Sequence, residues 1–114
     1  MRVQDLTRSC MEIAQDHDLT IVEGSGGLMV PLNEDMNFAD FAGALSANLV
    51  VVIRPGLGTL NHTTLTLEAA SKRNLSVEML VCNGLAAKPR LVEIENLRFL
   101  RSHYPQISLI TLRH

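Results

Sequence analysis

An acidic residue at the end of an apolar run is the first feature of this chain that could do chemistry. Leu19–Val22 is short and rich in β-branched side chains, and Glu23 follows it directly. A buried strand has this composition, and the carboxyl ends of parallel strands are where open α/β sheets bind ligands. Glu23 could therefore bind Mg²⁺, directly or through water. The alternative is a loop or N-cap acid, and the pattern alone leaves both open.

A glycine-rich turn follows that acid at Gly24, Ser25, Gly26 and Gly27. Its backbone N–H groups are free of bulky side chains and could bind an anion or a closely approaching substrate. A tight turn without a ligand is the simpler interpretation. A serine nucleophile is disfavoured, because the Gly-x-Ser-x-Gly pattern of hydrolases has a residue between the first glycine and the serine, and Gly24 directly precedes Ser25 here.

Two further apolar runs end in the same way. Leu49–Ile53 leads through glycines to a helix expected to begin near Thr59, whose first amides could bind a carboxylate or phosphate. Its alternative is a capped helix start, with Thr59 or Asn61 bonding those amides. The run before Asn83 is the third, and this amide could read a nucleobase edge or simply form a turn.

The elements that position these residues alternate between helix and strand. Apolar residues three and four apart predict helices, and short aliphatic runs predict strands. We expect a single α/β domain over 1–114, with a parallel sheet of about four strands and helices on both faces. The expected helices are 3–16, 38–47, 59–73 and 89–103, and the expected strands are 19–22, 49–53, 77–82 and 107–112.

Composition excludes several classes of protein. The 114 residues are 46% hydrophobic and 19% charged, with a net charge of −2 and scattered basic residues, which disfavours nucleic-acid and membrane partners. Cys10 and Cys82 lie in unrelated contexts and are expected to be free thiols in a reducing cytoplasm. We expect no signal peptide and no membrane span. The four histidines have no metal-ligand spacing.

One motif of phosphate-handling enzymes is not present. The sequence contains no Gly-x-x-x-x-Gly-Lys-Ser/Thr, and its only lysines are Lys72, within an expected helix, and Lys88, in a loop. No lysine of this chain is therefore placed to neutralise a transferred phosphoryl group, and we assign no catalytic residue.

Four motifs together resemble the dethiobiotin synthetase family. They are Val22–Leu32, Phe38–Asp40, Leu57–His62 and Val81–Asn83, in the order and spacing of the C-terminal half of that family's domain. The resemblance implies a P-loop-type, three-layer α/β homodimer that uses ATP, Mg²⁺ and CO₂. Such an enzyme closes the ureido ring of dethiobiotin on 7,8-diaminononanoate. One amine takes up CO₂ as a carbamate, ATP phosphorylates it, and the second amine displaces phosphate.

The same resemblance implies roles for individual residues. Glu23 matches the Mg²⁺ ligand, and Gly24, Ser25 and Gly26 match the turn beside the phosphates and the carbamate. Asn83 matches the adenine-reading asparagine. The helix start that binds the substrate carboxylate from the partner subunit is matched by Thr59, Leu60 and Asn61.

The chain departs from the family in three respects. It has no counterpart of the N-terminal half, which carries the P-loop lysine and threonine, a second lysine and a Mg²⁺-binding aspartate. Gly84 stands where an aspartate is common, and nothing after Pro105 resembles the family. Since these lysines and the metal stabilise phosphoryl transfer, we expect this chain alone to be inactive.

Three interpretations follow. The first is a dethiobiotin synthetase whose N-terminal half lies on a separate polypeptide or was left out of this sequence. The second is a non-catalytic remnant, or a dimerisation or regulatory module, of the same fold. The third, another amidoligase or ATPase, is disfavoured by the motif Gly58–His62. An open, apolar sheet edge also predicts a dimer or a higher oligomer.

Overall fold

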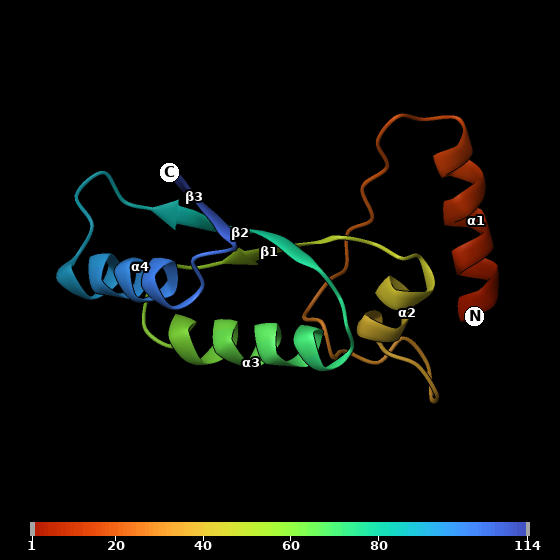
Figure 1. The fold of residues 1–114 in the computed structure, drawn as a ribbon, viewed down its shortest axis with the longest axis horizontal. Coiled ribbons are helices and arrows are strands. Elements are labelled where there is room, and N and C mark those ends of the chain that lie inside the picture. Colours follow the sequence, from red (N-terminus) through yellow and green to blue (C-terminus); the bar gives the residue numbers. More distant parts are fainter. Residues whose placement is uncertain (1, 114) are drawn as a thin grey trace.

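Three parallel strands form the centre of the computed structural model, which describes residues 2–113. They are β1 (Leu49–Ile53), β2 (Val77–Leu85) and β3 (Ser108–Arg113), in the order β1-β2-β3. The carboxyl ends of all three point to the same edge of the sheet (Figure 1). The parallel sheet and the α/β class are confirmed.

Two helices connect these strands and cover one face of the sheet. They are α3 (Thr59–Lys72), between β1 and β2, and α4 (Leu91–His103), between β2 and β3. Asn74, at φ 56°, ends the α3 segment in the left-handed conformation typical of a helix stop. The buried cluster between sheet and helices consists of Ile53, Cys82, Leu85, Leu97 and Leu100, with Val51, Leu60, Tyr104 and Leu109 packed against it.

The opposite face of the sheet is uncovered. Successive strand residues point to opposite faces, and on this face the residues of the two outer strands are exposed: Val50 by 57%, Val52 by 64%, Ile110 by 40% and Leu112 by 48%. Val81, between them on the central strand, is 9% exposed. Within residues 2–113, α3 and α4 therefore lie on one face, whereas the sequence predicted helices on both.

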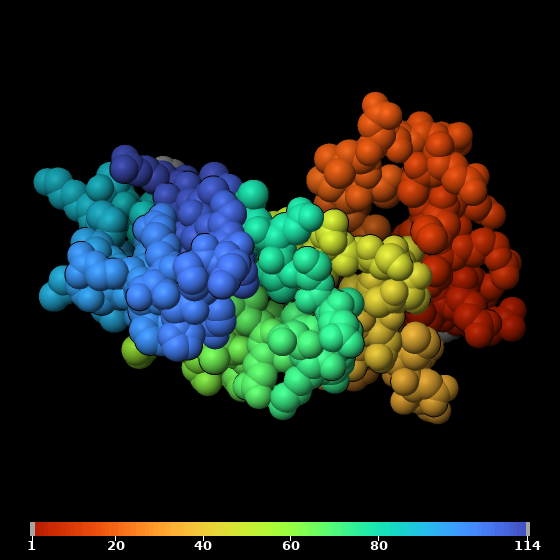
Figure 2. All heavy atoms as spheres, viewed as in Figure 1, coloured from red at the N-terminus to blue at the C-terminus, as the bar shows by residue number. Residues whose placement is uncertain are grey.

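The remaining helices form a lobe at one end of the molecule. They are α1 (Val3–Gln15) and α2 (Phe38–Ala44), which pack against each other (Figures 1 and 2). The radius of gyration is 15.6 Å, against about 13 Å for a compact domain of about 100 residues. Only Val3 of α1 is buried, and Ile13 on its predicted apolar face is 55% exposed. Within the lobe, α1 is therefore loosely packed, whereas α2 buries Ala39, Phe41 and Ala42.

The predicted strand Leu19–Val22 is wrong for this structure. The segment is extended but unpaired, and Leu19 and Ile21 are 77% and 82% exposed. An extended segment becomes a strand only when a neighbour pairs with its backbone, and no strand among residues 2–113 does so. The sheet consequently has three strands rather than four, and β2 continues to Leu85, beyond the predicted end at Cys82.

Candidate functional site

The start of α3 is the most developed candidate site. Gly58 is its N-cap residue at φ 93°, ψ −13°, a left-handed conformation that favours glycine, and it offers no side chain to cap the helix. Thr59 N–H donates to Gly56 O at 3.3 Å and His62 N–H to Gly58 O at 3.0 Å. No acceptor within residues 2–113 takes the N–H groups of Leu60 and Asn61.

These two amides are available for an external anion. The capping alternative is not seen, because the Thr59 hydroxyl is buried and lies 3.5 Å from the Thr63 hydroxyl, and Asn61 makes no side-chain hydrogen bond in the described chain. The positive end of the helix dipole adds a favourable potential for negative charge. The arrangement can bind a carboxylate or a phosphate, which is the chemistry predicted for Thr59, Leu60 and Asn61.

Asn96 holds the turn that precedes α3, and the sequence reasoning missed it. Its Nδ2 donates to Pro55 O at 3.0 Å and to Gly56 O at 3.2 Å, from a side chain on α4 that is only 8% exposed. Buried amides are usually satisfied in this way. The signal in the sequence was an asparagine beside Leu97 on the apolar face of a helix, where a solvated residue is not expected.

The glycine turn after Glu23 is shaped by close packing. A Cβ atom added to Gly24 would lie 2.9 Å from Cε1 of Phe38, the first residue of α2. Gly26 has φ 99°, and a Cβ atom added there would lie 2.9 Å from Val30 Cγ2. Side chains at either position would force a shift. The turn itself is exposed, so its backbone is accessible to a ligand.

The sequence predicted Glu23 at the carboxyl edge of the sheet, but the structure does not place it there. It follows the unpaired Leu19–Val22 segment, and Gly24 packs on α2, which precedes the amino end of β1. In Figure 1 this orange stretch runs beside α2, away from the end of the molecule where α3 begins. The structure therefore does not bring Glu23–Gly26 together with the start of α3.

The described residues do not form a complete binding site for the Mg²⁺ that the family resemblance implies. Glu23 is exposed and makes no hydrogen bond or ion pair within residues 2–113, and no three His, Cys, Asp or Glu side chains there gather as metal ligands. Mg²⁺ takes one or two carboxylates together with waters and substrate phosphates. Glu23 can supply one such ligand, so the described residues do not by themselves fit Mg²⁺.

Asn83, in contrast, lies near the turn before α3. It follows Cys82, which pairs with Ile53 at the end of β1, and it pairs in turn with Leu112. Its side chain is exposed, and the next residue, Gly84, has φ 90° where the register with β3 shifts. The sheet thus brings Asn83 and the β1–α3 turn to one edge.

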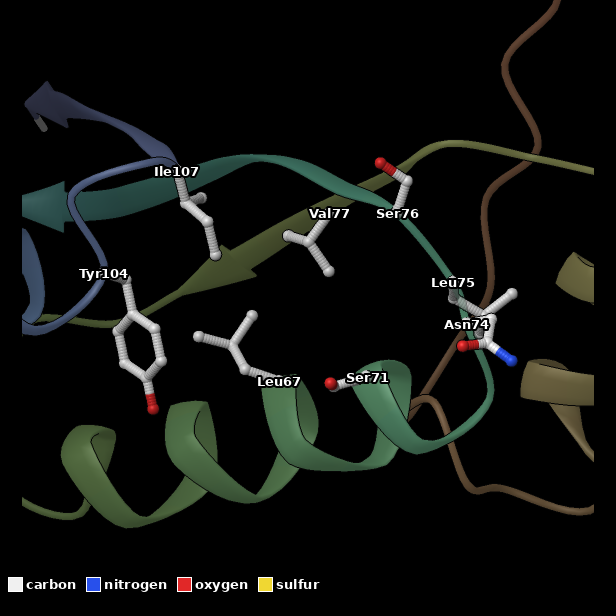
Figure 3. Close-up of a pocket in the computed structure, with 8 residues that line it drawn as sticks. All are labelled: Leu67, Ser71, Asn74, Leu75, Ser76, Val77, Tyr104 and Ile107. Carbon is white, nitrogen blue, oxygen red and sulfur yellow. The ribbon is translucent and has the colours of Figure 1, made fainter.

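An open hollow lies at the other edge of the sheet, where β2 and β3 begin. Its volume is about 500 Å³, and Figure 3 shows Leu67, Val77, Tyr104 and Ile107 converging on it, with Ser71 at one side. No charged side chain lines it. An uncharged hollow at the amino ends of the strands does not match the anion chemistry expected for this protein.

The fold and the open start of α3 define an α/β domain with a parallel sheet. A scan of protein-family models matches residues 1–110 to the family described as AAA domain, and the chain belongs to that family. No helix within residues 2–113 has both the length and the apolar character needed to cross a membrane.

Two individual relatives show which enzyme the chain resembles. The chain is 44% identical over 103 residues to the ATP-dependent dethiobiotin synthetase BioD of Mycobacterium avium, which is 90% of this chain and 46% of that protein. It is 40% identical over 94 residues to the enzyme of the same name from Bacillus licheniformis, covering 82% of this chain and 40% of the relative. The resemblance to dethiobiotin synthetase is thereby confirmed. The chain spans less than half the length of these curated relatives.

Proposed function

We propose that this chain forms part of an ATP-dependent dethiobiotin synthetase, a ligase of biotin biosynthesis acting on 7,8-diaminononanoate and CO₂. The names of its relatives support the reaction class. The observation that carries the proposal is the uncapped start of α3, where the amides of Leu60 and Asn61 are free. The substrate has one carboxylate, and a helix start with free amides binds such a group.

The other candidate residues are proposed to bind ATP and Mg²⁺. In this proposal the amides of Gly24, Ser25 and Gly26 lie against the phosphates and the carbamate, and Asn83 binds the adenine of ATP with its donor and acceptor. The proposal requires the Glu23–Gly26 segment to move to the carboxyl edge of the sheet in the assembled enzyme. Glu23 contributes one carboxylate to Mg²⁺, whose remaining ligands come from outside this chain. ATP supplies the phosphoryl group that makes the carbamate reactive.

The rest of the active site comes, in this proposal, from the family's P-loop half and from a second copy of the domain. A P-loop half covers the sheet, and a second copy completes a homodimer in which the start of α3 reaches the partner's substrate. The exposed Val50 and Val52 support a covering partner, because such an apolar face is costly to leave in water. The chain alone is proposed to be inactive, and its free thiols, Cys10 and Cys82, suit the cytoplasm.

A binding measurement without ATP tests the proposed pocket. Titration calorimetry of the purified chain with 7,8-diaminononanoate is expected to show binding, and the same diamine without its carboxylate is expected to bind at least about tenfold more weakly, a difference of about 1.4 kcal/mol. Equal binding of the two compounds, or no binding of either, would remove the carboxylate role of α3.

A further inference from the structure

The side chain of Asn96 makes a connection of a kind found nowhere else among residues 2–113. All other side-chain hydrogen bonds of the described chain join residues no more than four apart, whereas those of Asn96 reach Pro55 and Gly56 across 41 and 40 positions. Asparagine is also a poor helix former, because its amide competes for backbone groups. Its place on the buried face of α4 therefore needs a compensating interaction, and the two carbonyls provide it.

The two acceptors decide where α3 begins. In a regular α-helix each N–H donates to the carbonyl four residues earlier, so the N–H of Thr59 would pair with Pro55 O and that of Leu60 with Gly56 O. In the structure both oxygens accept from Asn96, at 3.0 and 3.2 Å, and Gly56 O also accepts the N–H of Thr59 at 3.3 Å. The helix consequently starts after Gly58.

The N–H of Leu60 is left without an intrachain acceptor by this arrangement, and the N–H of Asn61, whose acceptor in a regular helix would be Leu57 O, has none among residues 2–113 either. The turn itself is shaped by Gly58 at φ 93° and by the Thr59 N–H bond to Gly56 O. Asn96 binds this turn from a different element, so the position of α4 fixes the position of the free amides.

We propose that Asn96 is a positioning residue for the anion site at the start of α3. It holds the Pro55 and Gly56 carbonyls against α4 and thereby keeps the amides of Leu60 and Asn61 open to the carboxylate. This role rests on the proposed function, because it assumes that the helix start binds the substrate. Asn96 itself does not touch the substrate.

The test compares two variants of α4. Asn96→Asp keeps the size of the side chain but replaces its donor by an acceptor, which repels both carbonyls. Leu100→Ala lies one turn further along the same helix, is 1% exposed in the native chain, and removes packing without touching the turn. Affinity for 7,8-diaminononanoate is measured by the amide NMR shifts of Leu60 and Asn61, and stability by thermal unfolding.

We expect the Asn96→Asp chain to lose about tenfold or more in affinity, and the Leu100→Ala chain, although destabilised, to bind as the native chain does. If Asn96→Asp does not fold, Asn96→Ser is measured instead and is expected to show the same loss in smaller degree. Native-like affinity in the folded Asn96 variant, or an equal loss in Leu100→Ala, would overturn the positioning role and leave the proposed function intact. Failure of the native chain to bind would overturn both.

Discussion

The ring of Phe38 lies so close to Gly24 that a Cβ atom at that glycine would be 2.9 Å from Cε1. This contact ties the glycine turn to the first residue of α2. It is supported by backbone hydrogen bonds from Phe38 N–H to Val30 O at 3.1 Å and from Ala39 N–H to Leu28 O at 2.9 Å. The turn is therefore fixed to the α1–α2 lobe rather than to the sheet.

Replacing Gly24 by alanine is expected to destabilise the lobe. The new methyl group must displace the Phe38 ring, and overpacking of this kind costs about 1–3 kcal/mol. Gly27→Ala is the matched control, because nothing lies within 4 Å of its Cβ position. Urea unfolding measures both variants, and equal stabilities would show that the Phe38 contact does not constrain the turn.

Gly58→Ala is expected to weaken both stability and carboxylate binding. An L-residue at φ 93° is strained, at a cost of about 1–2 kcal/mol, and relief of that strain would move the first turn of α3. Gly56→Ala, which has open space around its Cβ position, serves as the control. Calorimetry with 7,8-diaminononanoate reports binding, and a Gly58→Ala chain that binds as tightly as Gly56→Ala would contradict the account.

The start of α2 is held by a reciprocal cap. Asn37 Oδ1 accepts from Asp40 N–H, and Asp40 Oδ2 accepts from Asn37 N–H, both at 2.9 Å. Loss of such a cap costs about 1 kcal/mol. Asn37→Ala and Asp40→Ala should each lower the thermal midpoint, and the double variant should lose less than their sum because the bonds form one unit. Strict additivity would argue against the capping box.

The uncovered sheet face predicts self-association or capture of a partner. Val52→Lys introduces a charge on this face and should shift the chain towards monomer in light scattering, whereas Leu91→Lys, at the first residue of α4 and already 73% exposed, should change nothing. A native chain that is a monodisperse monomer would contradict the proposed dimer.

Burial raises the pKa of the Cys82 thiol above its ordinary value of 9.0, with Glu93 adding to the shift and Arg101 opposing it. The unfolded chain therefore loses this proton at a lower pH than the native chain does. Between the two pKa values the unfolded state binds fewer protons, so the free energy of unfolding falls as the pH rises above about 9. Unfolding of native and Cys82→Ala chains at pH 8 and 10 measures this, and the native chain should lose more. An equal loss would contradict it.

The sequence predicted those elements whose signals are local. The helices expected over 38–47 and 59–73 follow from the spacing of their apolar residues, and the structure confirms a helix in each range, α2 and α3. The strand Leu49–Ile53 was also predicted from a local signal, because five consecutive aliphatic residues need burial.

The predictions that failed concerned features that depend on contacts between segments far apart in the sequence. Leu19–Val22 has the composition of a strand, but pairing requires a neighbour, which no run of residues can supply by itself. The same holds for Asn96, whose role arises from contacts 40 and 41 positions away. The grouping of Glu23 with Asn83 relied on that strand and is not seen.

Formation of dethiobiotin tests the central claim most directly. The purified chain is incubated with 7,8-diaminononanoate, ATP, Mg²⁺ and bicarbonate, alone and together with a polypeptide carrying the P-loop half of a dethiobiotin synthetase, with complex formation checked by light scattering. We predict no product from the chain alone and ATP-dependent dethiobiotin from the complex. Product from the chain alone, or none from an assembled complex, would contradict the account, and the second result would favour a non-catalytic remnant.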